Sequence, residues 1–188
     1  MPGQSKPGTT TFVALLRGIN VGGKNMLSMA ALKTSFGKLR FKDVTTYINS
    51  GNVIFKSSEG DPRKLEQKIE RMLTKDYDLA CKVVVRSFSE MEELVKSLPR
   101  SWNDDKKWRY NVIFLRHTID SPRLIDTLKH NKDVEQLVYR PGTLLWSARL
   151  EDAKRTIMLK LSSQKVFQDM TVRNANTTRK IFELMKKV

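Results

Sequence analysis

The sequence predicts an α+β fold made of two similar antiparallel halves, and three observations support this. Apolar runs typical of strands alternate with amphipathic runs typical of helices along the 188 residues. Short turn sequences, Ser50-Gly51 and Pro141-Gly142, separate pairs of strands and indicate hairpins. Both halves read strand–helix–strand–strand–helix–strand, followed by a helix. This is the split β-α-β, or ferredoxin-like, order, and it occurs twice.

The domain boundaries follow from this repeated order. We predict a disordered tail over residues 1–9, a first ferredoxin-like half over 10–99, a linker over 100–107 and a second half over 108–188. The tail is polar and lacks the apolar core of a signal peptide. Each half is small but can form a core with its partner. The pattern leaves open whether the two sheets pack side by side or join at their edges.

In the first half, capping residues define the helices. Ser28 is expected to cap the first helix and Gly37 to end it. Asp61 caps the second helix, and Ser89 with Glu92 forms the capping box of the third. The predicted strands cover 10–16, 44–49, 52–56 and 81–86.

The second half repeats these elements with weaker signals. Its first helix is expected to begin at Ser121, its second lies within 152–161, and its third runs over about 176–187 with Asn176 or Thr177 as the cap. The predicted strands cover 108–116, 134–139, 143–148 and 170–173.

The topology predicts which polar loops meet. In a ferredoxin-like half, the first two strands are parallel and the third lies between them. The end of the first strand therefore shares a sheet edge with the turn between the second and third strands. We expect the loop Arg17–Asn25 to lie beside the turn Asn49–Asn52.

The loop after the first strand has the composition of an anion cradle. It carries Arg17 and Lys24 with three glycines, and a helix follows, so that backbone N–H groups and the helix dipole favour an anion. The alternative is that the glycines only shape a turn and Lys24 is solvated. Gly18 to Asn25 matches the phosphate-binding loop of nucleotide hydrolases except at its end, where Asn25 replaces the hydroxyl residue that binds magnesium. The hairpin order also disagrees with the parallel sheet of those enzymes, so a nucleotide hydrolase is not expected.

A second polar motif, Thr171–Lys180, also joins a strand end to a helix start and could either cap the helix or bind a ligand. The candidate ligand-binding residues of the whole chain are Arg17, Asn20, Gly22, Gly23, Lys24, Asn25, Asn49, Ser50, Asn52, Arg173 and Asn174.

The charge of the chain indicates a phosphate-bearing partner. The net charge is +15, distributed as +6 over residues 1–50, +1 over 51–100, +3 over 101–150 and +5 over 151–188. The excess lies at the two ends, which carry the two polar motifs. An electropositive face for nucleic acid or a phosphorylated small molecule is one interpretation, and general basicity that serves solubility is the other.

Several classes of site and location are excluded or disfavoured by composition. One cysteine, Cys81, allows no intrachain disulfide, and with two histidines it is too few for a zinc site of sulfur and nitrogen ligands. No metal and no cofactor is predicted. No apolar run has the roughly 20 residues of a membrane span, so we expect a cytoplasmic protein without membrane contact. The oligomeric state is not predicted.

Three motifs resemble one family. Ala-Leu-Leu-Arg-Gly-Ile-Asn-Val-Gly-Gly-Lys-Asn (14–25), Thr-Tyr-Ile-Asn-Ser-Gly-Asn-Val-Ile-Phe (46–55) and Thr-Val-Arg-Asn (171–174), with Thr177 and Lys180, resemble the bacterial domain-of-unknown-function family sixteen ninety-seven. The resemblance implies the duplicated ferredoxin-like fold. It implies no established activity, substrate or cofactor.

The expected function is therefore phosphoanion binding, with nucleic acid the favoured ligand class. The alternative is an enzyme that acts on a small anionic or phosphorylated substrate at the edge formed by Arg17–Asn25. Such an enzyme needs a general base, which the sequence does not place there.

Overall fold

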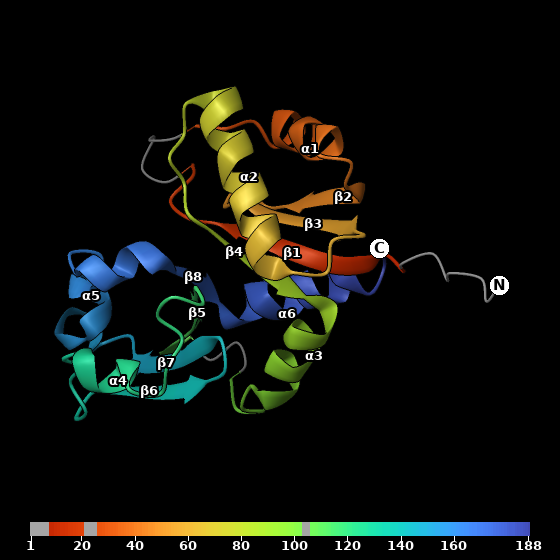
Figure 1. Cartoon of the computed structure of the whole chain (residues 1–188). Coiled ribbons are helices and arrows are strands. Elements are labelled where there is room, and N and C mark those ends of the chain that lie inside the picture. Colours follow the sequence, from red (N-terminus) through yellow and green to blue (C-terminus); the bar gives the residue numbers. More distant parts are fainter. Residues whose placement is uncertain (1–7, 21–25, 103–105) are drawn as a thin grey trace. The chain divides into compact units, whose positions relative to one another are not determined.

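The computed structural model describes residues 8–20, 26–102 and 106–188, and its elements are labelled in Figure 1. The chain divides into two compact units. The first unit is formed by Met1–Glu92 and Ile181–Val188, and the second by Glu93–Lys180. The unit boundary falls inside α3 (Phe88–Ser97) and inside α6 (Ala175–Met185).

The first unit contains a four-stranded antiparallel sheet with two helices on one face (Figure 1). Its strands lie in the order β2-β3-β1-β4, and alternate residues of β1, β3 and β4 pack against α1 and α2. Phe55 stacks on Phe12 and Phe41, with ring centroids 5.9 and 4.3 Å apart. The elements are β1 (Thr10–Leu16), α1 (Met29–Lys38), β2 (Lys42–Tyr47), β3 (Asn52–Ser57), α2 (Pro62–Tyr77) and β4 (Val83–Ser87).

The second unit contains a sheet of the same topology, in the order β6-β7-β5-β8. Its helices are shorter, and the apolar residues of α4 and α5 pack on one face of the sheet around Trp146. The elements are β5 (Trp108–Leu115), α4 (Leu124–Thr127), β6 (Glu135–Arg140), β7 (Thr143–Arg149), α5 (Ile157–Leu161) and β8 (Met170–Asn174), with 3-10 turns at Ala153–Arg155 and Lys165–Asp169. The predicted duplicated α+β fold is confirmed.

The strands of the two sheets pair in the same register, and this pairing defines equivalent positions in the two halves. Leu16 pairs with Val83 as Leu115 pairs with Met170. One residue further along, the N–H of Arg17 donates to the carbonyl of Lys82. In the second half, the N–H of Arg116 donates to the carbonyl of Asp169 in the same way. By the same register, Gly51 is equivalent to Gly142, and Arg86 to Arg173.

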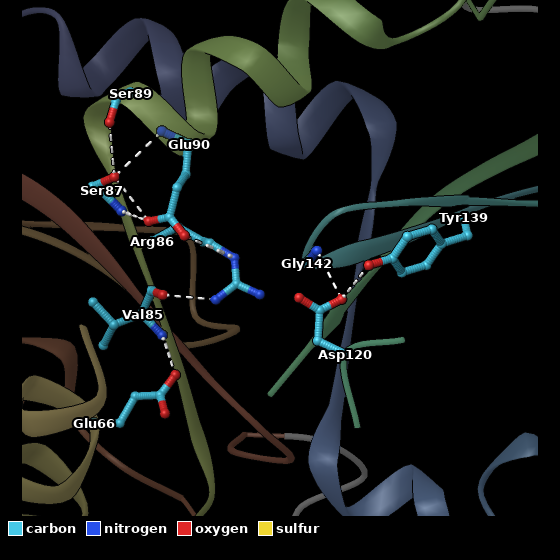
Figure 2. Close-up of polar contacts among 9 residues, drawn as sticks. All are labelled: Glu66, Val85, Arg86, Ser87, Ser89, Glu90, Asp120, Tyr139 and Gly142. Atoms are coloured by element: carbon cyan, nitrogen blue, oxygen red, sulfur yellow. Dashed lines mark hydrogen bonds and ion pairs between the residues drawn. The ribbon is translucent and has the colours of Figure 1, made fainter. Parts of the chain in front are cut away.

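Two glutamates of α2 bind the outer N–H groups of β4, an edge strand of the first sheet. The N–H groups of Val83 and Val85 point away from β1 and donate to Glu70 and Glu66, respectively, each over 3.0 Å. Figure 2 shows the bond between Val85 and Glu66. An edge strand with unpaired N–H groups is a template for aggregation. These carboxylates occupy that edge and join α2 to β4.

Some helix boundaries differ from those predicted. The capping box of α3 is Ser87 with Glu90, not Ser89 with Glu92: the Glu90 N–H donates to the Ser87 hydroxyl, and the Ser87 N–H donates to Glu90 (Figure 2). The cap of α6 is Asn174, whose side chain accepts from the N–H of Asn176.

In α1, Gly37 stays inside the helix. The left-handed residue after this helix is Arg40, with φ 63°. The helix predicted within 152–161 is interrupted at Thr156, which is extended, and the next N–H, from Ile157, donates to Glu135. The helix predicted from Ser121 is limited to the four residues of α4.

Candidate functional site

The candidate site lies where β1 ends, and two backbone hydrogen bonds extend the sheet past that point. The N–H of Leu16 donates to the carbonyl of Gly51 over 2.8 Å, and the N–H of Arg17 donates to that of Lys82 over 3.1 Å. Half-buried Arg17 therefore lies between the β2–β3 turn and the residue before β4. We call this edge of the first unit the rim, and it comprises residues 17–20, 48–52 and 81–82.

Asn20 joins the loop after β1 to the turn between β2 and β3. Its amide nitrogen donates to the carbonyl of Asn49 and to that of Leu27, each over 2.9 Å, and its amide oxygen accepts from the N–H of Leu27. The predicted neighbourhood of loop and turn is confirmed by this contact. Because both amide hydrogens are used within the protein, Asn20 holds the two segments together.

Asn52 has a similar role inside the turn. Its side chain is fully buried, and its amide nitrogen donates to the carbonyl of Tyr47 and to the hydroxyl of Ser50. Unpaired burial of such an amide would be costly, so these bonds stabilise the turn conformation. Asn52 therefore supports the rim as a buried side chain that holds the turn together.

The exposed part of the turn is formed by Ile48 and Asn49. Ile48 has φ 48° and its side chain is 49% exposed, although a left-handed conformation is strained for a β-branched residue. Asn49 is exposed and Ser50 is half-buried. The turn therefore presents Asn49 to solvent in a conformation that Asn20 and Asn52 maintain.

The rim is more elaborate than its equivalent in the second unit. Twelve residues (17–28) separate β1 from α1, but only eight (116–123) separate β5 from α4. Four residues (48–51) join β2 to β3, but only two (141–142) join β6 to β7. The longer loop and the longer turn are the two segments that Asn20 connects.

At one strand-end position the second unit has an acidic residue where the rim has a basic one. Buried Arg116 forms an ion pair with Asp169, with Nε and Oδ1 3.5 Å apart. The position equivalent to Asp169 is Lys82, whose ammonium group lies 3.7 Å from Glu70 of α2. The residue whose carbonyl accepts from the next strand is thus basic in the first unit and acidic in the second.

Asp120 closes the short turn of the second unit. Its Oδ1 accepts from the hydroxyl of Tyr139 and from the N–H of Gly142, each over 3.0 Å (Figure 2). Burial, the hydrogen bond to Asp120 and the charge of Asp120 together raise the pKa of Tyr139 above its usual value of 10.0. Asp120 therefore holds the β6–β7 turn through one carboxylate oxygen.

We expect the Tyr139 hydroxyl to stabilise the fold below about pH 10 and to lose this contribution at higher pH. The raised pKa means that the folded state holds the phenolic proton more tightly than the unfolded state, so stability falls as pH rises through the folded pKa. Urea unfolding between about pH 9 and 11 should show a steeper decline for the wild type than for Tyr139→Phe. Equal declines for the two proteins would contradict this role.

Several predicted site residues lie elsewhere. Gly22, Gly23, Lys24 and Asn25 lie outside the described residues. Arg173 and Asn174 belong to the second unit. Arg173 is 8% exposed, and its guanidinium donates to the hydroxyl of Thr171 and the carbonyl of Val172.

The sequence interpretation did not single out Lys82, Ile48 or the Arg86–Arg173 equivalence. Arg86 donates to the carbonyl of Val85 as Arg173 donates to that of Val172, both over 2.9 Å. An alignment of the two halves by strand register, rather than by residue type, would have revealed these positions. In the parts of the chain that the structure describes, no group of three or more His, Cys, Asp or Glu residues could hold a metal ion.

No helix in the described residues is long and apolar enough to cross a membrane.

Comparison with known proteins finds a matching family model and a similar solved structure. Residues 9–146 match a family model described as "Protein of unknown function (DUF1697)". The conserved bacterial protein SP0830 from Streptococcus pneumoniae has a similar solved structure, with 29% sequence identity and a TM-score of 0.83. The match covers 95% of this chain and 99% of that chain. No curated protein matches the chain significantly.

Proposed function

The chain belongs to the DUF1697 family of proteins of unknown function, and we propose from the chemistry of its rim that it binds phosphate-bearing ligands, with nucleic acid the favoured class. One observation carries the proposal. The loop between the first strand and the first helix, and the turn between the second and third strands, are both longer in the first half than in the second, and these longer segments carry cations and amides. A simple scaffold of two equivalent halves needs no such difference.

In this proposal, the rim residues have two kinds of role. Arg17 and Lys24 supply charge, and the N–H groups of Gly22–Asn25 form a cradle for a phosphate. Asn49 and Ser50 supply directional hydrogen bonds. Asn20 and Asn52 hold the loop and the turn in place, since their amides are used within the rim.

Arg173 and Asn174 receive no ligand contact in the proposal. Arg173 braces β8 through Thr171 and Val172, and Asn174 caps α6. These contacts account for both side chains as parts of the second unit.

The net charge of +15 favours a polymer of phosphates over a single small anion. A strongly basic protein binds nucleic acid largely through phosphate contacts and counterion release. An elaborated, cation-bearing edge then gives one place where the strand would be held. The competing explanation, that basicity serves solubility alone, makes a different prediction for the variants below.

Catalysis at the rim is less well supported than binding. Two neighbouring groups could act as base or nucleophile, Glu70 and Cys81. Glu70 accepts from the N–H of Val83 and pairs with Lys82, and the buried Cys81 thiol donates to the carbonyl of Arg17 over 3.1 Å. Because both groups are used in holding the strands together, the rim offers contacts rather than a reactive centre.

We expect Arg17→Gln with Lys24→Gln to weaken binding of labelled single-stranded RNA by roughly tenfold at low salt. Fluorescence anisotropy across a salt series should show the slope of log affinity against log salt reduced by about 1.4, the value for two lost phosphate contacts on a single strand. The melting temperature should change little.

The matched control is Lys33→Gln with Lys38→Gln, which removes two exposed cations of α1. This pair should leave the slope nearly unchanged. An equal loss in the control would assign the binding to general charge, and no binding of RNA or DNA by the wild type at low salt would refute the proposal.

A further inference from the structure

A second cationic feature lies entirely within the second unit. A hollow of about 520 Å³ is formed by the C-terminal turn of α3, the chain that follows it and the first turns of α6. Small-molecule sites have volumes of roughly 300–1,000 Å³. The residues that matter for its chemistry are Lys96, Leu98, Arg100, Trp102, Asn176 and Arg179.

The lining residues that the structure describes carry a net positive charge. Three of its residues, Lys96, Arg100 and Arg179, are cationic, and none of the described lining residues is acidic. Within the described part of the chain, neither Arg100 nor Arg179 forms an ion pair with a carboxylate. Like charges at one concave surface repel each other, and an anion placed among them relieves that repulsion.

Arg179 is held in a position that leaves donors available. One guanidinium nitrogen donates to the amide oxygen of Asn176 over 3.3 Å, and the other donates to the carbonyl of Pro99 over 3.4 Å. A guanidinium has five N–H donors in a fixed fork, so these two long bonds orient the group and leave other N–H donors for a ligand. The fork geometry suits the oxygens of a phosphate.

An aromatic stack provides a rigid apolar wall beside these cations. Trp102 is 8% exposed and stacks on Tyr110, with centroids 5.1 Å apart, and Tyr110 stacks on Trp108 at 6.2 Å. Leu98 is also buried. Because the wall is pre-formed, a ligand with a flat or apolar part beside its anionic group loses little in ordering it.

We propose that this hollow binds a nucleoside phosphate, either as a free nucleotide or as a nucleotide of a nucleic acid strand. The three cations contact the phosphate, and the wall formed by Leu98 and Trp102 contacts the nucleoside. The proposal does not rest on the rim, since the hollow shares no residue with it and belongs to the other unit.

In the test, the full-length protein is titrated with AMP, UMP, adenosine and inorganic phosphate, and binding is measured by calorimetry. Binding of a labelled hexanucleotide is measured by fluorescence anisotropy. A nucleotide should bind more tightly than adenosine or phosphate alone. Arg179→Gln should weaken this binding roughly tenfold, as expected for a lost charge-assisted contact. Arg123→Gln, an exposed cation of the same unit, is the matched control and should have no effect.

Arg100→Gln is a second variant, in case Arg179→Gln impairs folding. Because Arg100 is exposed, this substitution should weaken binding without lowering the melting temperature. Loss of mononucleotide binding in both variants supports the proposal with a free nucleotide as ligand. Loss of hexanucleotide binding alone supports it with a strand as ligand. Unchanged binding in both variants, or a wild type that binds neither a mononucleotide nor the hexanucleotide, overturns it.

The rim variant separates this proposal from the proposed function. Arg17→Gln with Lys24→Gln should leave mononucleotide binding at the hollow intact, whereas Arg179→Gln should leave the rim's contribution to the RNA salt slope intact. Mononucleotide binding and the RNA salt slope therefore test the two proposals independently of each other.

Discussion

Replacing Glu135 by leucine is expected to lower the free energy of unfolding by about 3–5 kcal/mol. The Glu135 carboxylate is 4% exposed and accepts hydrogen bonds from three groups of the second unit. These donors are the N–H of Asn131 at 2.7 Å, the indole N–H of Trp146 at 2.5 Å and the N–H of Ile157 at 2.9 Å. Leucine fills the space but removes the acceptor of all three donors, two of which, those of Trp146 and Ile157, are buried.

The cost arises because Glu135 connects three separate segments. It joins the loop before β6, the centre of β7 and the first residue of α5. Each buried donor left unpaired costs about 1–3 kcal/mol. Amide hydrogen exchange should locate the effect, with faster exchange at Asn131 and Ile157 than in the wild type.

Glu135→Gln tests the contribution of charge and of the second oxygen. Glutamine keeps one acceptor but turns an NH₂ group toward the donors, so we expect a loss of about 1–3 kcal/mol. Glu151→Gln is the matched control, because Glu151 pairs with Arg149 on the exposed surface, and such pairs contribute about 0–1 kcal/mol. Equal effects of the two glutamine variants in urea unfolding would refute this role of Glu135.

Local signals were sufficient to predict most of the fold. The first strand was predicted over 10–16, and β1 has these bounds. Ser28 and Asp61 cap their helices through side-chain hydrogen bonds, as predicted. The motifs at the end of β1 and in the following hairpin also predicted the family, which the match over residues 9–146 confirms.

Boundaries that depend on distant residues were predicted wrongly. Around α3 the sequence Ser-Phe-Ser-Glu-Met-Glu (87–92) fits a capping box in two registers, and local chemistry does not choose between them. The structure selects the earlier register, in which Phe88 packs against Phe182 with ring centroids 5.3 Å apart. That partner lies at the other end of the chain, so no local pattern indicated it.

The candidate site was predictable in its topology but not in the roles of its residues. The order of strands was enough to place the loop after β1 beside the β2–β3 turn. It did not reveal that Asn20 and Asn52 use their amides within the protein, because a free and a bonded amide have the same sequence signature. The charge contrast between Lys82 and Asp169 required the register of both sheets.

Gly51→Ala is expected to lower the free energy of unfolding by about 2–4 kcal/mol. Gly51 has φ 74°, a conformation that costs an L-residue with a side chain about 1–2 kcal/mol. A Cβ at this position would also lie 2.7 Å from Cδ1 of Ile19 and 2.8 Å from Cβ of Leu16. Since Leu16 is part of β1, relief of the second contact requires a shift of the strand or the turn.

Two other glycines separate the causes of this loss. Gly18 has φ 66° but nothing within 4 Å of an added Cβ, so Gly18→Ala should show the conformational cost alone, about 1–2 kcal/mol. Gly37 lies in α1 with open space around it, so Gly37→Ala should stabilise the protein by about 0.5–1 kcal/mol. If Gly51→Ala costs no more than Gly18→Ala in urea unfolding, the rim accommodates a methyl group, and the close packing of the turn on β1 does not limit its conformation. If it costs more, the difference measures that packing, and binding of RNA by Gly51→Ala should fall together with it, because the same turn carries Asn49 and the carbonyl that Asn20 holds.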